Sequence, residues 1–171
     1  LIETLNSDNL FWRLHAQRLL VERADELPVK ELANLATVPA SDETAAPHAM
    51  WAMEPSNWRN GGVAGGIIAE GLLGRLKSPS AAIRRNSLQV LPRDEYVTDK
   101  ILSLNLLNDR EPQVRLAALL ALAESPPDAE AGAALAELLQ HQDVQSDRWL
   151  LDGLTAAAAA QGTNFLAASA K

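Results

Sequence analysis

Apolar residues recur along the chain with the spacing of a helix, and the same arrangement returns five times. The five segments are FWRLHAQRLL (11–20), APHAMWAM (46–53), IRRNSLQVLP (83–92), VRLAALLALAE (114–124) and WLLDGLTAAAA (149–159). One residue of each segment aligns with the others, and these reference positions are Arg13, Ala46, Arg84, Arg115 and Leu150. They follow one another at intervals of 31 to 38 residues, a period that is typical of helical-repeat proteins.

Three further sets of positions share one chemical character across the five segments. Three residues after the reference position the side chain is always small: Ala16, Ala49, Ser87, Ala118 and Gly153. Seven residues after it the side chain is always apolar: Leu20, Met53, Leu91, Leu122 and Ala157. One residue before it stand Trp12, Ala45, Ile83, Val114 and Trp149. At about 100° per residue these positions share one helix face, so we predict that they are buried and that the small residues allow close helix approach.

Four other stretches with a helical pattern lie between these segments, at 28–38, 65–77, 94–109 and 128–141. Prolines and glycines separate them, and the predicted N-caps are Asp8 and Asn9, Ser78, Asp94 and Asp128. No alternating run rich in valine or isoleucine indicates a strand. The pattern predicts an all-α protein, an α-α superhelix of about five helix pairs. We expect one domain over 1–171, and a piece of a longer polypeptide because the first unit begins partway through, at LIETL.

The clearest copy of the repeat, LLNDREPQVRLAALLALAE (106–124), resembles the HEAT-like repeats of armadillo-type solenoids. The residues that match the family pattern are Asp109, Pro112, Val114, Arg115 and Ala118. The resemblance implies that the aspartate and the arginine form a ladder between neighbouring repeats. Other units depart from it, since Ser7 and Ser78 stand at the aspartate position, and Ala46 and Leu150 at the arginine position.

A second resemblance covers most of the chain. DNLFWRLHAQRLLVER (8–23) and the later segments are similar to the repeat region of certain large bacterial proteins. In those proteins a β-propeller resembling sorbosone-type sugar dehydrogenases precedes HEAT-like repeats, and a c-type haem domain often follows. The resemblance implies a periplasmic or secreted location and, as an alternative function, an accessory domain of such an oxidoreductase. Dehydrogenation and electron transfer would belong to the other domains.

Composition narrows the classes of function. Hydrophobic residues make up 47% of the 171 residues but aromatic residues only 4%, which favours closely packed helices over a sheet. Without cysteine there is no disulfide and no thiolate metal site. The apolar runs are too short to span a membrane, so no membrane insertion is expected. The net charge of −7 disfavours nucleic acid as a partner.

Two residue groups could carry chemistry. His15 and His48 occupy the same repeat position, where two imidazoles could approach a metal ion, but no third ligand is spaced to join them, and we expect packing. The glycine-rich stretch 60–71 lacks the strand and the lysine of a phosphate loop, and we interpret it as a loop that enters a helix. We therefore expect no metal, no cofactor and no catalytic residue.

A cluster of arginines leaves open a second alternative function. A basic stripe could be formed by Arg13, Arg18, Arg84, Arg85 and Arg115. HEAT-like DNA glycosylases line a concave face with such residues, so a nucleic-acid enzyme of that type is the second alternative. Acidic residues outnumber basic residues by 22 to 15, and we therefore expect no nucleic-acid binding.

The helix face opposite the predicted core is more apolar than a solvated face should be. We predict that it forms a partner-binding groove lined by Leu14, Arg18, Trp51, Arg85, Leu116, Leu120 and Leu151. Two alternatives are that the helical phase is displaced by one residue, or that terminal helices cover this face. Because of this predicted groove, we interpret the chain as a non-catalytic scaffold or interaction module. Its partner would be another protein or neighbouring domains of its own longer chain.

Overall fold

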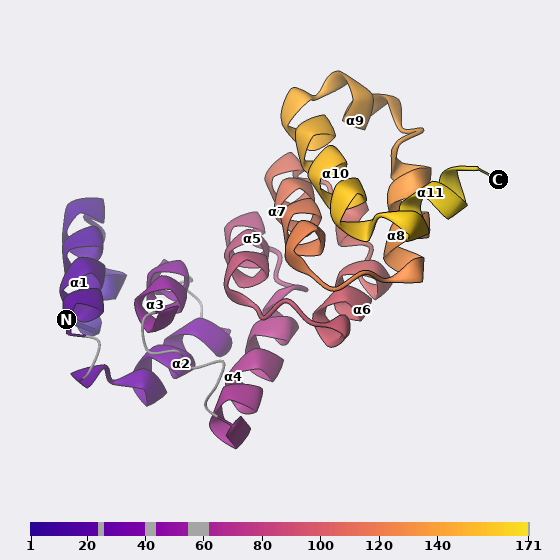
Figure 1. The fold of residues 1–171 in the computed structure, drawn as a ribbon. Coiled ribbons are helices and arrows are strands. Elements are labelled where there is room, and N and C mark those ends of the chain that lie inside the picture. The colour runs from indigo at the N-terminus through magenta and orange to yellow at the C-terminus, as the bar shows by residue number, and fades with distance from the viewer. Residues whose placement is uncertain (24–25, 40–43, 55–61, 171) are drawn as a thin grey trace. The chain divides into compact units, whose positions relative to one another are not determined.

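The computed structural model describes residues 1–23, 26–39, 44–54 and 62–170, which form helices and the turns that connect them (Figure 1). The first helices are α1 (Leu10–Glu22), α2 (Val29–Thr37), α3 (Ala45–Met53), α4 (Gly62–Arg75), α5 (Ala81–Val90) and α6 (Glu95–Ser103). They are followed by α7 (Pro112–Glu124), α8 (Ala129–Leu138), α9 (Gln142–Ser146), α10 (Arg148–Gln161) and α11 (Thr163–Ser169). Short 3₁₀ helices include η1 (Glu3–Asn6) and η5 (Leu106–Asn108). None of the described residues forms a strand, and the predicted all-α class is confirmed.

The chain divides into two compact units, Leu1–Leu91 and Pro92–Lys171, called unit 1 and unit 2 below. In unit 1, α3 contacts α1, α2 and α5, and α2 also contacts α4. In unit 2, α7 contacts α10, α6 contacts α8, and α11 packs on α8. Within each unit, the helices that contain the five repeated segments therefore pack on one another, with the intervening helices beside them. The extent of a single domain over 1–171 stays a prediction.

Side-chain caps begin several helices as the sequence predicts. Asn9 accepts a hydrogen bond from the Phe11 amide at 2.9 Å, and Asp94 and Asp128 cap α6 and α8 at 2.8 Å. The prediction for Ser78 is wrong, because α5 begins after Ser80 and the Ser78 hydroxyl instead accepts from the Ser80 amide at 3.2 Å. Caps are local features of three or four residues, which is why a sequence pattern finds most of them.

The small-residue positions are all buried, as are the apolar positions four residues later in each segment. At Gly153 of α10, an added Cβ would lie 2.9 Å from Cδ1 of Leu116 and 3.5 Å from Cβ of Leu119, both on α7. A side chain there would therefore press on the neighbouring helix. The two sets of positions form the core of each unit, and this part of the predicted register is confirmed.

Two of the positions that precede the reference residues are not buried. Trp12 is 50% exposed and Trp149 is 67% exposed, whereas the other three members of this set are buried. Trp12 lies near the start of α1, where its ring contacts Phe11 and His15 of its own helix. The prediction that these positions are buried is therefore wrong at the two tryptophans. The helical phase places a side chain on one face of its helix but does not decide whether a neighbouring helix covers that face.

Three features of unit 2 were absent from the sequence-based prediction. The predicted helix over 94–109 is interrupted at Asn105, whose φ of 53° is left-handed, so that α6 and η5 are separate. Residues after 141 form the additional short helix α9. The chain then reverses at Gly162, with a φ of 51°, to form α11.

Candidate functional site

Four residues of the predicted groove lie in unit 1, on α1, α3 and α5. Leu14 is 51% exposed, Arg18 is exposed, and Trp51 is 36% exposed. The Trp51 indole Nε1 donates a hydrogen bond to Asn86 Oδ1 at 2.6 Å, which links α3 to α5 and holds the ring in place. These side chains are outside the core, but Trp51 also contributes to the packing between two helices.

The two arginines of this set differ in their surroundings. Arg18 donates to Glu22 at 2.8 Å in an exposed pair on α1, and such pairs contribute little to stability. Arg85 is half-buried, and its Nε is buried without a hydrogen-bond partner among the described residues.

The other three residues of the predicted groove lie in unit 2, on α7 and α10. Leu120 is 45% exposed, whereas Leu116 and Leu151 are half-buried. Leu116 lies against Gly153, so its side chain contributes to the contact between α7 and α10. Leu120 is therefore the most accessible apolar side chain of the three.

The two histidines occupy different environments in unit 1. His48 Nδ1 is 2.7 Å from Gln17 Oε1, while its Nε2 accepts from Arg13 Nε at 3.3 Å, which corresponds to a neutral imidazole with a proton on Nδ1. Burial, and to a lesser degree the Arg13 guanidinium, holds the pKa of His48 below its ordinary value. His15 instead stacks on Phe11. The His48 contacts join α1 to α3, and the described residues contain no group of three or more metal-ligating side chains.

Besides Arg18, which pairs with Glu22, three more arginines of the possible basic stripe bind groups of the protein itself. Arg13 Nη1 donates to the Ser7 carbonyl at 2.6 Å, and Arg84 Nη1 donates to the Ser78 carbonyl at 2.8 Å. The two arginines thus make the same contact, to the backbone of the residue where the family has aspartate. Arg115 pairs with Asp143 in the segment before α10, and its hydrogen bond lowers the pKa of that carboxyl.

The glycine-rich stretch forms the first part of α4, except for positions 60 and 61, which lie outside the described residues. An added Cβ at Gly71 would lie 2.5 Å from Thr37 Cβ on α2. Close packing of α4 on α2 therefore explains this glycine without any phosphate ligand. An open apolar hollow of about 870 Å³, lined by residues such as Val29, Thr37 and Ile67, lies between the same two helices.

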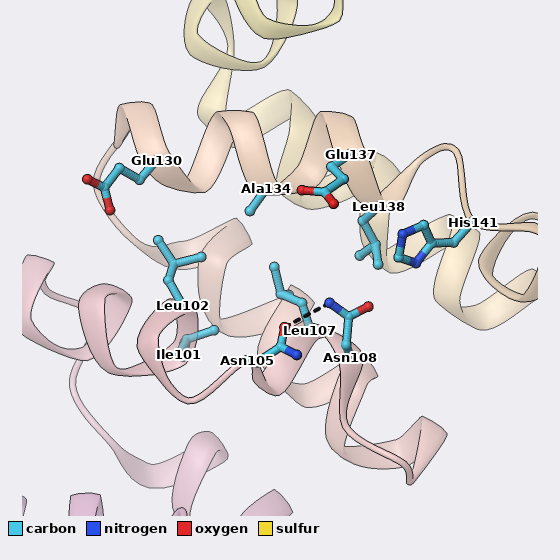
Figure 2. A pocket seen from close by; sticks show the side chains of 10 residues that line it. All are labelled: Ile101, Leu102, Asn105, Leu107, Asn108, Glu130, Ala134, Glu137, Leu138 and His141. Carbon is cyan, nitrogen blue, oxygen red and sulfur yellow. Dashed lines mark hydrogen bonds between the residues drawn. The ribbon is translucent and has the colours of Figure 1, made fainter.

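A smaller cavity of about 260 Å³ lies between α6 and α8 of unit 2 (Figure 2). Its lining consists of Ile101, Leu102, Asn105, Leu107, Asn108, Glu130, Ala134, Glu137, Leu138 and His141. Its apolar side chains come from both sides, with Ile101, Leu102 and Leu107 facing Ala134 and Leu138 of α8, and the other five lining residues are polar (Figure 2). Sequence analysis missed this cavity, although Glu130 and Glu137 are seven residues apart in the 128–141 helix and so share one face.

Within the described ranges no helix is long and apolar enough to cross a membrane. No protein-family model matches the chain, and no curated protein matches it. Among solved structures it is similar to an engineered protein from the Northeast Structural Genomics Consortium, with 18% identity and a TM-score of 0.58. The similarity covers 98% of this chain and 78% of the engineered protein. At this level of identity it concerns the fold alone.

Proposed function

We propose that the chain is a non-catalytic HEAT-like helical-repeat module, an α-α superhelix of about five helix pairs that binds a protein partner. The buried small-residue positions support this arrangement, as does the packing of the repeat-bearing helices on one another within each unit. The partner is another protein or a neighbouring domain of the same longer chain. The resemblance to the repeat region of sorbosone-dehydrogenase-like proteins supports one specific form of this proposal. In that form, the chain is an accessory domain of a multidomain oxidoreductase.

The observation that carries the proposal is the exposure of large apolar side chains opposite the core. Leu14 and Leu120 are each about half exposed, and they extend from α1 and α7 on the side away from the buried small residues Ala16 and Ala118. Covering such a side chain contributes roughly 1.5–3 kcal/mol before the cost of ordering is subtracted. In HEAT-like proteins these helices line the concave surface, which is where a partner would bind.

The hydrogen bonds of the arginine side chains favour an interaction module over a nucleic-acid enzyme. Arg13, Arg84 and Arg115 each donate from Nη1 to a carbonyl or carboxylate group of the protein, so this nitrogen of each is already engaged. Phosphate binding requires a clustered set of available cations. The function proposed here therefore depends on apolar contacts and does not require phosphate recognition.

The test is a double variant with one substitution in each unit, Leu14→Gln and Leu120→Gln. The matched control is Ile67→Gln with Leu166→Gln, which changes two exposed apolar side chains on α4 and α11, outside the predicted groove. Binding is measured by calorimetry against the separately expressed segments encoded beside this chain in the same gene. We expect both variants to melt as the wild type does and the groove variant alone to bind at least tenfold more weakly. Equal binding by both variants would exclude Leu14 and Leu120 from the interface.

A further inference from the structure

The cavity between α6 and α8 combines apolar side chains with two carboxylates. Ile101, Leu107 and Leu138 line it and are buried, and Ala134 and Leu102 complete the apolar lining. Glu137, His141 and Asn108 lie at one end, and Glu130 lies toward the other (Figure 2). Half of the lining residues are apolar and half are polar, and a pocket that combines an apolar surface with convergent polar groups can hold a small ligand.

The acidic groups of this cavity have no cation of the protein beside them. Among the residues that the structure describes, the side chains of Glu130, Glu137 and His141 make no hydrogen bond or ion pair, and no lysine or arginine lines the cavity. The nearest basic residue in the sequence, Lys100, has its Nζ over the Tyr96 ring, 5.0 Å from the centroid. The two carboxylates are thus available to a cation from outside.

The C-terminal ends of α6 and α8 contribute lining residues to the cavity. Asn105 and Asn108 follow the end of α6, and Glu137 and His141 stand at the end of α8. The last carbonyl groups of a helix carry partial negative charge and favour a cation nearby. Asn108 Nδ2 donates to Asn105 Oδ1 at 2.8 Å, which positions the two amides along the edge.

We propose that this cavity binds an aliphatic cation, an ammonium or guanidinium group on an apolar stem, such as a lysine or arginine side chain. The stem would lie against the apolar side chains, and the charged end would lie at the carboxylate of Glu137. Lysine and arginine side chains have this division between an apolar stem and a charged end. With about 260 Å³, the cavity suits one side chain and is smaller than the sites of most drug-sized ligands.

This inference goes beyond the proposed function, because it concerns α6 and α8 and not the helices that carry Leu14 and Leu120. Either one can fail without the other. A peptide-borne lysine and a free alkylamine share the chemistry of the ligand, and the experiment separates these two sources.

The experiment is a titration of the whole chain, followed by ¹H–¹⁵N NMR of the Asn105 and Asn108 side-chain amides. The cationic probes are Nα-acetyl-lysine N-methylamide, whose ε-ammonium group is free, and n-butylamine. The control probe, Nα-acetyl-norleucine N-methylamide, keeps the apolar stem but lacks the charge. We expect saturable shifts with the two cations, with a dissociation constant on the order of 10 mM, and binding of the norleucine probe weaker by about tenfold. Tighter binding of the lysine probe indicates a peptide as the source, and equal binding of both cations indicates a free amine.

Glu137→Gln tests the role of the carboxylate, with Glu70→Gln on α4 of unit 1 as the matched control. Both carboxylates are exposed, and we expect both variants to melt as the wild type does. Glu137→Gln should weaken binding of the lysine probe by about threefold, and Glu70→Gln should leave it unchanged. If Glu137→Gln destabilises the fold, Glu137→Ala takes its place. Norleucine binding equal to that of lysine, wild-type affinity in the carboxylate variant, or an absence of saturable shifts would each overturn the proposal.

Discussion

Replacement of two glycines of α4 by alanine tests the packing of α4 on α2, because the same substitution should change stability in opposite directions. At Gly66 an added Cβ would meet no atom within 4 Å. At Gly71 it would lie 2.5 Å from Cβ and 2.6 Å from Cγ2 of Thr37. Both glycines lie in the interior of one helix, so the two variants differ mainly in this contact.

The magnitude follows from two terms. Alanine stabilises a helix interior by about 1 kcal/mol relative to glycine, and this gain applies at both positions. At Gly71 the contact is about 1 Å shorter than a normal carbon–carbon approach, and overpacking of this kind costs roughly 1–3 kcal/mol. Thr37 cannot turn away easily, since its hydroxyl donates to the Ala33 carbonyl at 2.8 Å and its χ1 is restricted. We therefore expect Gly66→Ala to raise the free energy of unfolding by about 1 kcal/mol, and Gly71→Ala to lower it by up to about 2 kcal/mol.

The assay is urea denaturation followed by circular dichroism, with wild type and both variants measured at one pH. The difference between the two variants isolates the overpacking term, because the helix-propensity term is common to both. If Gly71→Ala stabilises the protein as much as Gly66→Ala does, then α2 and α4 do not approach each other as closely as the structure has them.

The remaining predictions concern the core and pH. Ala118→Leu inserts three carbons at a fully buried small-residue position and should destabilise by roughly 1–3 kcal/mol; a wild-type urea midpoint would contradict the predicted register. His48 has a lowered pKa in the folded state, so its contribution to stability is present above its ordinary value of 6.5 and is lost as the pH falls through the lowered value. Urea midpoints between pH 7 and pH 5 should therefore fall more steeply for wild type than for His48→Gln, and equal slopes would show that His48 is not held neutral.

Much of the fold follows from local signals in the sequence. The buried state of Ala16, Ser87 and Ala118 could be predicted from their common position in a repeated helical pattern. The caps at Asn9 and Asp128 could be predicted because a cap depends on a few neighbouring residues. These features depend on helix geometry, which is the same wherever the helix lies.

The candidate sites were less predictable, because they depend on which helices meet. The sequence places Trp51 and Leu116 on the face away from the core, but not the hydrogen bond from Trp51 to Asn86 or the contact of Leu116 with Gly153. For the cavity between α6 and α8, the left-handed turn at Asn105 separates α6 from η5, and Asn105 and Asn108 form part of the edge opposite Glu137.

The sequence by itself determined the all-helical class, the repeated helices and the small buried positions, since these arise from periodicity and from interactions over a few residues. Tertiary structure decided that Trp12 and Trp149 are exposed, that His48 bonds to Gln17 and Arg13, and that Glu130 and Glu137 line one cavity in unit 2. The reason is physical. A helical pattern fixes the direction in which a side chain leaves its own helix, whereas burial, hydrogen bonding and cavities require a second surface whose position is set by the packing of the chain.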